Sequence, residues 1–157
     1  MHKIHWTSIY STGIKELDAQ HQWMMELSNR VLSALAKKST SEMLTNSIKS
    51  LIEFTKQHFH DEERLMKAGN YPGQTAHKQA HQEHLRQLGR EILRINSDEE
   101  FCIDSVREFL KSWLITHILQ DDKKVAEHIL KKAPKTIATL QMSETDTSKE
   151  QESIQTH

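Results

Sequence analysis

Apolar residues recur along most of the chain at intervals of three and four positions, the spacing of amphipathic helices. Little of the sequence alternates with the period of two that is typical of strands. Long helices with short connections favour an antiparallel up-down-up-down arrangement. We therefore expect an all-α fold, a four-helix bundle. The expected helices span residues 14–37, a second segment between its caps at residues 39–41 and Gly69, residues 74–95 and residues 101–132.

The length of 157 residues fits one folded domain, which we place at residues 1–134 with a short N-terminal arm before the first helix. Pro134 is expected to end the last helix, because proline cannot continue the backbone hydrogen bonding. Residues 135–157 are polar and nearly free of bulky apolar side chains, a composition typical of disorder. We expect them to form a flexible C-terminal tail.

The overall composition excludes several classes of protein. The 21 basic and 22 acidic residues are spread along the chain and give a net charge of −1, whereas a nucleic-acid-binding surface needs clustered lysine and arginine. No stretch approaches the roughly 18 apolar residues of a membrane span, and "MHKIHWTSIY" has no secretory h-region. Cys102 is the only cysteine, so no intrachain disulfide can form and a cytoplasmic location is expected.

Six polar residues interrupt the core-facing stripes of the four helices. Buried carboxylates and imidazoles are costly unless they are paired, and a domain has only about 5–15 kcal/mol of total stability. One such histidine is easily explained by a hydrogen bond to a neighbour, but six together indicate a bound metal. The six residues are His21, His58, Glu62, His77, His81 and His117.

The spacing of these residues narrows the kind of metal site. His58 and Glu62 are four residues apart, as are His77 and His81, so each pair points to one spot from one helix face. The Glu-x-x-His pairs of carboxylate-rich di-iron bundles do not occur in the sequence. The predicted site is therefore rich in histidine.

Four separated motifs occur in the order found in the hemerythrin family, and the sequence closely resembles that family from about Ile4 to Ile129. The motifs are "HWTSIYSTGIKELDAQHQ", "HFHDEERLM", "YPGQTAHKQAH" and "WLITHILQDDKK". The resemblance implies two iron ions with a bridging oxo or hydroxo group. It implies five imidazole ligands, His21, His58, His77, His81 and His117, and two bridging carboxylates, Glu62 and Asp122. By the same likeness, one iron takes His77, His81 and His117, and the other takes His21 and His58.

One implied ligand conflicts with simple helix geometry. Asp121, four residues after His117, is the expected partner in an α-helix, whereas the family pattern selects Asp122. Asp122 shares a stripe with Ile118 and Val125, so the inner face of the helix is expected to drift toward it. We choose Asp122 as the ligand and regard Asp121 as its exposed neighbour.

The resemblance implies reversible dioxygen binding. Five imidazoles, two bridging carboxylates and one bridging oxygen fill all but one of roughly twelve octahedral positions on two irons, and dioxygen takes the open one. No nucleophile or general acid is required, so we expect an oxygen carrier, storage or delivery protein rather than an enzyme. The rival functions are an oxygen or redox sensor, which would act through an unidentified protein partner, and a di-iron oxidoreductase acting on dioxygen, peroxide or nitric oxide. A closed structural zinc site is disfavoured, because it needs only four ligands.

Residues beside the ligands resemble the apolar lining of the family's oxygen pocket, although the same residues would also serve as plain core. This predicted lining comprises Met24, Phe59, His84, Trp113, Leu114 and Ile118. His84 stands where family members often carry phenylalanine, and we hypothesise that its ring alters autoxidation; the alternative is a rim histidine turned to solvent. Glu63 is expected to be a surface charge. The histidines at positions 2, 5, 60, 128 and 157 are expected to be exposed.

Overall fold

The structure is a computed structural model that describes residues 3–97 and 102–132. The described residues form helices and no strand, which confirms the predicted all-α class. The helical elements are η1 (Ser8–Tyr10), α1 (Lys15–Ala36), α2 (Ser41–Ala68), α3 (Gln74–Ser97), α4 (Ile103–Ile115), η2 (Thr116–Asp122) and α5 (Lys123–Lys132).

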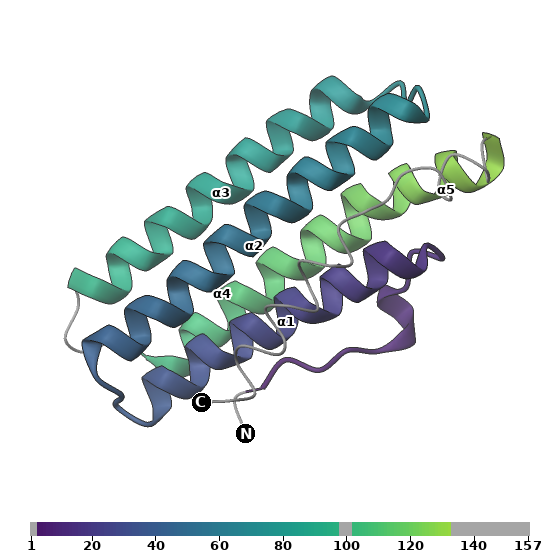
Figure 1. Ribbon diagram of the computed structural model, residues 1–157. Helices are drawn as coiled ribbons and strands as arrows, with labels where there is room; N and C mark the ends of the chain where they lie inside the picture. Colours follow the sequence, from purple (N-terminus) through teal and green to yellow (C-terminus); the bar gives the residue numbers. More distant parts are fainter. Residues whose placement is uncertain (1–2, 98–101, 133–157) are drawn as a thin grey trace.

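The long helices lie side by side and run alternately up and down (Figure 1). Helix α1 packs against α2 and α4, and α2 packs against α3. The fourth predicted helix is present as three consecutive segments, because the π-helical η2 separates α4 from α5. The predicted four-helix bundle is thus confirmed, with one local change of helix type in its last member.

The ends of α2 are set by residues that the sequence indicated. Thr40 is the N-cap, and its side chain accepts a hydrogen bond from the backbone N–H of Met43. Gly69 is the C-cap. A Cβ atom at Gly69 would clash with Cδ1 of Ile129, so the absence of a side chain there allows the end of α2 to approach α5.

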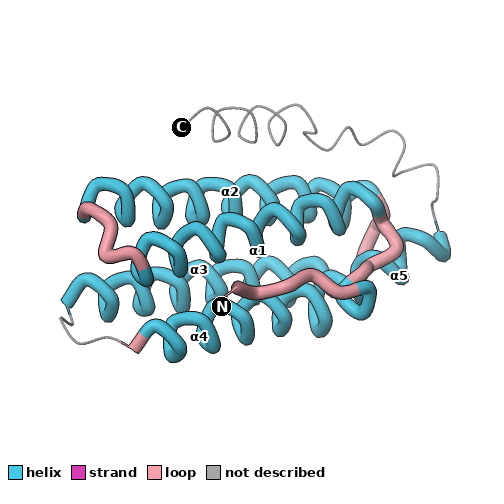
Figure 2. The backbone as a smooth tube through the Cα atoms, turned by 90° about the horizontal axis from the view of Figure 1, so that it is seen from below, coloured by secondary structure: helices cyan, strands magenta, loops and turns pink. Residues whose placement is uncertain are grey.

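The N-terminal arm runs along the bundle (Figure 2) and is attached to α1 at two points. The Asn29 side chain accepts from the backbone N–H of Ile4 at 2.7 Å and donates to its carbonyl at 2.9 Å. The Asp18 carboxylate accepts from the hydroxyls of Ser11 and Thr12 and from the Thr12 N–H. The contacts of Asp18 hold the start of α1, at Lys15, six residues before His21.

The core consists of two apolar clusters with a polar layer between them. Along α1, Leu17 belongs to the smaller cluster and Met24 to the larger, with His21 between them. The reverse order occurs along the antiparallel last helix, where Ile118 of the larger cluster and Val125 of the smaller cluster flank Asp122. The smaller cluster comprises Ile14, Leu17, Leu65, Met66, Val125, Ala126 and Ile129. The bundle therefore contains one cross-section in which polar side chains replace the hydrophobic core.

The predicted flexible tail, residues 135–157, lies outside the described residues. Within residues 3–97 and 102–132, none of the helices combines the length and the apolar character that a bilayer crossing requires.

Candidate metal centre

The polar layer contains all seven side chains predicted as ligands, and each of the four helices of the bundle contributes to it, the last one through η2. His21 comes from α1, His58 and Glu62 from α2, His77 and His81 from α3, and His117 and Asp122 from η2. None of the seven is more than 6% exposed. The structure thus brings together the residues that lie up to 101 positions apart in the sequence.

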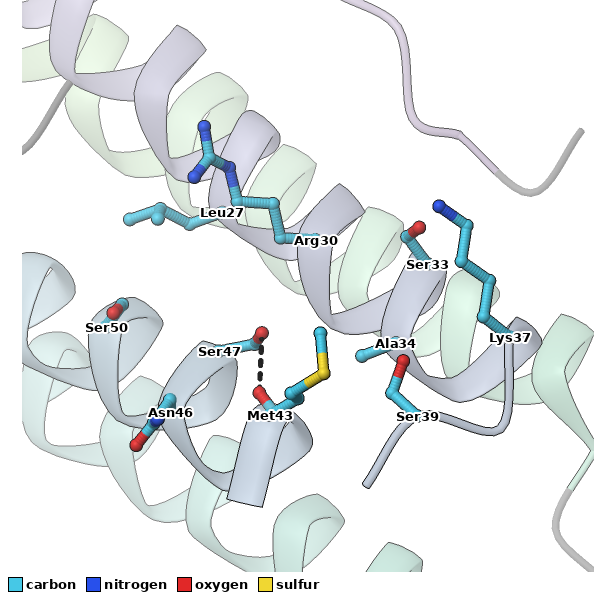
Figure 3. A pocket seen from close by; sticks show the side chains of 10 residues that line it. All are labelled: Leu27, Arg30, Ser33, Ala34, Lys37, Ser39, Met43, Asn46, Ser47 and Ser50. Atoms are coloured by element: carbon cyan, nitrogen blue, oxygen red, sulfur yellow. Dashed lines mark hydrogen bonds between the residues drawn. The ribbon is translucent and has the colours of Figure 1, made fainter. Parts of the chain in front are cut away.

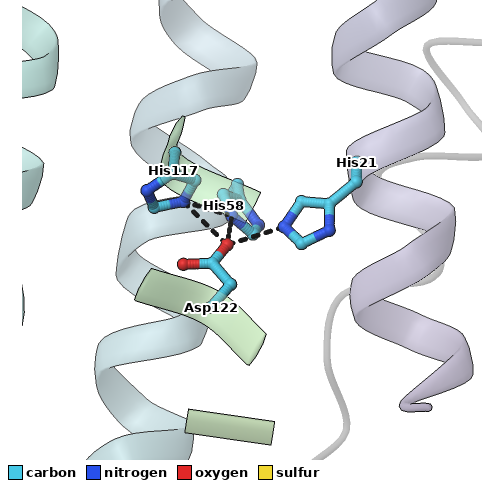
Figure 4. A group of neighbouring side chains, drawn as sticks. All are labelled: His21, His58, His117 and Asp122. Carbon is cyan, nitrogen blue, oxygen red and sulfur yellow. Dashed lines mark hydrogen bonds and ion pairs between the residues drawn. The ribbon is translucent and has the colours of Figure 1, made fainter. Parts of the chain in front are cut away.

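The carboxylate of Asp122 lies at the centre of this layer, facing three imidazoles (Figure 4). Its Oδ2 is 2.7 Å from Nε2 of His21 and 2.8 Å from Nε2 of His117. The same Oδ2 is 3.3 Å from Nε2 of His58. Its Oδ1 faces the other way and lies 3.2 Å from Nε2 of His77.

The carboxylate of Glu62 is arranged in a similar way. Its Oε1 lies 3.1 Å from Nε2 of His77, and its Oε2 lies 3.1 Å from Nε2 of His81. The same Oε2 is 3.6 Å from Nε2 of both His58 and His117. Glu62 and Asp122 therefore each contact imidazoles from both halves of the predicted ligand set, as two bridging carboxylates would.

Among the described residues, the potential ligand atoms form three overlapping groups, in each of which all atoms lie within 4.8 Å of one another. Two groups lie in the polar layer, namely His21, His58, His117 and Asp122, and His77, His81, His117 and Asp122. The third, beside the layer, is His84, His117 and Asp121. His117 belongs to all three, and Asp122 to both groups of the layer. The division of the histidines between two irons stays a prediction, because His117 lies between the two positions.

The π-helical segment η2 explains the choice between the two aspartates. Residues five apart lie on one face of a π-helix, so Asp122 faces the same way as His117. Asp121 is displaced to the side, and its side chain is 28% exposed. The expected drift of the inner face toward Asp122 is therefore a local change of helix type.

Several buried polar atoms of the layer are better placed to bind a cation than to form hydrogen bonds with one another. Among the described residues, Glu62 Oε1, His77 Nε2 and Asp122 Oδ1 are buried without a hydrogen-bond partner. His77 Nε2 nevertheless lies 3.1 and 3.2 Å from the two oxygens, so the atoms are close but not aligned for hydrogen bonds. Unpaired oxygen and nitrogen atoms that converge in this way suit metal coordination, in which all three would donate to one ion.

The imidazoles and carboxylates of the layer shift one another's pKa values. Burial alone would lower the pKa of His77, but the carboxylates of Asp122 and Glu62 raise it to about 10. Burial lowers the pKa of His117 to about 4 despite the attraction of the same two carboxylates. Burial would also raise the pKa of Asp122, yet His117, His21 and His58 hold it well below its ordinary value. The site thus keeps its carboxylates ionised, as metal ligands must be.

The imidazole of His58 is also held from outside the layer, by contacts that were not predicted from the sequence. Nδ1 of His58 lies 2.7 Å from Oε1 of Gln20. The Gln20 amide donates to Oδ2 of Asp61 at 2.9 Å, and Gln57 donates to the other oxygen of this carboxylate. Gln20 and Asp61 are both buried. In the sequence, the one sign of a role for Gln20 was its position directly before His21.

The prediction that Glu63 is only a surface charge is wrong. Its Oε1 lies 3.0 Å from Nδ1 of His81, and its side chain is only 31% exposed. A residue next to Glu62 on α2 thus reaches across to α3. Glu63 orients the imidazole of His81 from the side opposite Glu62, as outer carboxylates commonly do at metal sites.

All six residues of the predicted pocket lining are buried. The ring of Phe59 stacks on His81 with centroids 3.9 Å apart and lies 4.9 Å from the ring of His117. Trp113 donates its indole N–H to the backbone carbonyl of His84. Phe59 thus covers imidazoles on two helices, and the role of the lining as an oxygen pocket stays a prediction.

His84 is not the rim histidine of the alternative interpretation, since it is 6% exposed. Its ring centroid lies 5.0 Å from that of His117, and its Nε2 lies 3.5 Å from Oδ2 of Asp121. This contact lowers the pKa of Asp121, although burial would raise it. Asp121 is therefore a half-buried partner of His84 rather than an exposed neighbour of the ligands.

The histidines expected at the surface divide into three cases. His5 and His60 are exposed as predicted, and positions 2 and 157 lie outside the described residues. The prediction for His128 is wrong, because this residue is half-buried and its Nε2 lies 2.8 Å from the carbonyl oxygen of Gly69.

A hollow of about 480 Å³ lies on the surface between the end of α1 and the start of α2 (Figure 3), and none of the seven predicted ligands lines it. Its lining includes Leu27, Arg30, Lys37, Met43 and several serines. Arg30 is engaged elsewhere, in a contact with Glu26 and in a position over the ring of Trp23. The hollow holds neither imidazoles nor carboxylates, so the polar layer is the candidate site.

Comparison with known proteins agrees with the geometry of the layer. The sequence model of the hemerythrin HHE cation binding domain matches residues 12–129. A bacteriohemerythrin from Stenotrophomonas maltophilia (strain R551-3) is 28% identical, covering 79% of this chain and 80% of its own. A bacteriohemerythrin from Pseudomonas aeruginosa (strain LESB58) is 31% identical, covering 74% and 75%. A hemerythrin-like protein from Naegleria gruberi is 32% identical, covering 76% and 87%.

The match spans all four bundle helices and every residue of the polar layer. Its domain binds cations, and the two overlapping groups of buried histidine and carboxylate side chains suit a di-iron centre. The chain belongs to the hemerythrin family.

Proposed function

We propose that this protein binds dioxygen reversibly at a di-iron centre and acts as an oxygen carrier, storage or delivery protein. The ligands in this proposal are His21, His58, Glu62, His77, His81, His117 and Asp122. The observation that supports it most directly is the pair of carboxylates, Glu62 and Asp122, each of which contacts imidazoles of both halves of the ligand set; the contact of Glu62 with His58 is the longer one, at 3.6 Å. When bound, two ferrous ions would supply two electrons and one open coordination position for dioxygen.

The residues around the ligands favour reversible binding over turnover. Phe59, Trp113, Leu114 and Ile118 are buried and would keep bulk water and reductants from the ligand position. Met24, one turn after His21, extends this lining along α1. An apolar cover of this kind slows the loss of electrons to solvent, since charged products are poorly stabilised in a dry site.

One observation favours a second function, a di-iron oxidoreductase acting on dioxygen, peroxide or nitric oxide. Such an enzyme needs a polar path to the site, and the His84–Asp121 contact connects the side of His117 to a partly exposed carboxylate. A carrier would not need this pair. The rate at which the oxygenated protein is irreversibly oxidised therefore distinguishes the two functions.

The test is a visible absorption spectrum of the iron-loaded protein, reduced without air, exposed to dioxygen and then freed of it, with iron per chain determined in parallel. Two irons per chain and a charge-transfer band that appears and disappears with dioxygen are expected. Immediate and irreversible oxidation would support the oxidoreductase or a redox sensor, and fewer than two metals per chain would contradict the di-iron proposal. The matched variants are His77→Leu, which should lose the band, and His60→Leu, which removes an exposed histidine of α2 and should keep it.

A further inference from the structure

His81 and His58 each use the ring nitrogen opposite the polar layer to contact an acceptor, and the two acceptors differ in charge. Nδ1 of His81 faces the carboxylate of Glu63 at 3.0 Å. Nδ1 of His58 faces the neutral amide oxygen of Gln20 at 2.7 Å. In both rings Nε2 faces the carboxylates of the layer, so Nδ1 carries the proton when Nε2 binds a metal.

We propose that Glu63, acting through His81, makes the iron held by His77, His81 and His117 the first of the two to be oxidised. The inference rests on the proposed di-iron function and adds a regulation of that same site. Glu63 is a positioning residue in this scheme, since it contacts the ligand histidine and not the metal.

The reason is the charge of Glu63, the residue that contacts His81 on the side away from the polar layer. A carboxylate that accepts a hydrogen bond from a ligand imidazole increases the basicity of the ring. A stronger donor stabilises a ferric ion more than a ferrous ion, because the interaction grows with the charge of the metal. Glu63 is 31% exposed, so water weakens this effect without removing it.

The other position receives a weaker version of the same contact. The carbonyl of Gln20 is only a dipole, and the nearby negative charge belongs to Asp61, which contacts the Gln20 amide rather than the histidine. The charge of Asp61 is also shared with the amide of Gln57. His58 is therefore the poorer donor of the pair, and the ion that it holds keeps its ferrous state to a higher potential.

The proposed redox step transfers one electron and no proton. A ferrous ion held by His77, His81 and His117 would give one electron to an outer-sphere one-electron oxidant, such as the mediators of the titration below, and would become ferric. The Nδ1 proton of His81 remains in its contact with Glu63, and no covalent bond is formed or broken. The order leaves the two-histidine position ferrous, where the open coordination position is proposed.

The experiment is an anaerobic redox titration of the full-length, iron-loaded protein with electrochemical mediators, which resolves two one-electron midpoints. Glu63→Gln should raise the lower midpoint; a tenfold loss of ferric preference corresponds to about 59 mV. Gln20→Glu combined with Asp61→Asn should lower the upper midpoint, because it places a carboxylate on His58 and replaces the carboxylate that the Gln20 amide contacts with an amide. Glu53→Gln removes an exposed charge of α2 that pairs with Lys49 and should move neither.

A second measurement does not depend on iron redox chemistry. Competition between the protein and a chelator for Co²⁺ should show one of two sites weakened about 10–100-fold by Glu63→Gln, and neither site weakened by Glu53→Gln. A lower midpoint and cobalt affinities unchanged by Glu63→Gln would overturn the inference while leaving dioxygen binding intact. A shift confined to the upper midpoint would overturn the proposed order, and a wild-type protein without two metals would overturn both proposals.

Discussion

His117 and Asp122 are five residues apart, and Nε2 of His117 lies 2.8 Å from Oδ2 of Asp122. In an α-helix a step of five residues turns the side chain about 140° away, so this contact depends on the π-helical η2. The irregular segment therefore has a definite structural effect, because it brings a carboxylate into the layer from the same helix as an imidazole.

The two neighbouring aspartates should differ sharply in metal binding. Asp122→Asn removes the charge that faces His21, His58 and His117, and we expect the protein to retain fewer than two irons per chain. Asp121→Asn, the matched control, should retain two, because Asp121 contacts His84 instead. Metal analysis after desalting measures both. Equal iron contents in the two variants would contradict the assignment of Asp122.

Removal of iron should weaken the fold. The contacts between imidazoles and carboxylates offset only part of the cost of burying the seven proposed ligands, so metal binding is expected to contribute to folding stability. We expect chelation to lower the free energy of unfolding of the wild-type protein by several kcal/mol. The loss should be smaller in Asp122→Asn, which starts with less metal. Denaturant unfolding with and without chelator gives both values, and no change in the wild type would contradict the prediction.

The iron-free protein should be most stable near pH 6.5. His117, with its pKa lowered to about 4, binds a proton only on unfolding as the pH falls below its ordinary value of 6.5, so acid favours unfolding. His77, with its pKa raised to about 10, loses its extra proton on unfolding between pH 6.5 and 10, so rising pH also favours unfolding.

Iron should abolish the alkaline decline, because a metal-bound His77 is neutral in the folded protein. Denaturant unfolding from pH 5 to pH 9 measures the profile with and without iron. His77→Gln should remove the alkaline slope from the iron-free protein as well. A slope that persists in this variant would assign the effect to another group.

His84→Phe should slow autoxidation of the oxygenated protein. The substitution replaces a buried imidazole beside His117 and ends its contact with Asp121, which removes a polar path toward solvent. The rate is read from the decay of the absorption band in air. An unchanged rate would show that the ring, although buried, has no influence on the site.

Much of this structure could be predicted because the same sequence patterns recur in several helices. Apolar residues at helical spacing recur over each long helix, and the caps of α2, Thr40 and Gly69, are typical cap residues. The ligand pairs His58–Glu62 and His77–His81 occupy positions where a leucine would continue the stripe. Regular periodicity thus predicts both the bundle and most of its polar layer.

The missed features depend on geometry that periodicity does not contain. The segment "THILQDD" carries no proline or glycine to indicate a π-helix, and Asp122 was indicated by the spacing of the family motif and by the stripe that it shares with Ile118 and Val125. Glu63 and Gln20 lie beside the inner stripe, and their long side chains reach a neighbouring helix. Such contacts between helices follow from tertiary packing, so the sequence of one helix does not predict them.

Gly69, the C-cap of α2, and Gly89, within α3, make a matched test of packing. Gly69→Ala should lower the free energy of unfolding by about 1–3 kcal/mol, because its Cβ would meet Ile129. Gly89→Ala meets nothing within 4 Å in α3 and should raise the free energy of unfolding by about 0.5–1 kcal/mol. Urea unfolding of both variants decides this; stabilisation by both substitutions would mean that α2 and α5 separate easily.

The distribution of the ligands along the chain also sets when the site can exist during protein synthesis. His21 leaves the ribosome early, whereas His117 and Asp122 follow about a hundred residues later, several seconds or more at ordinary translation rates of about 5–20 residues per second. A nascent chain therefore presents only part of the donor set, and iron acquired at that stage would be held by exposed, exchangeable groups. Stable metal incorporation is thereby coupled to completion of the last helix, so that a truncated chain would not mature into the iron-loaded form.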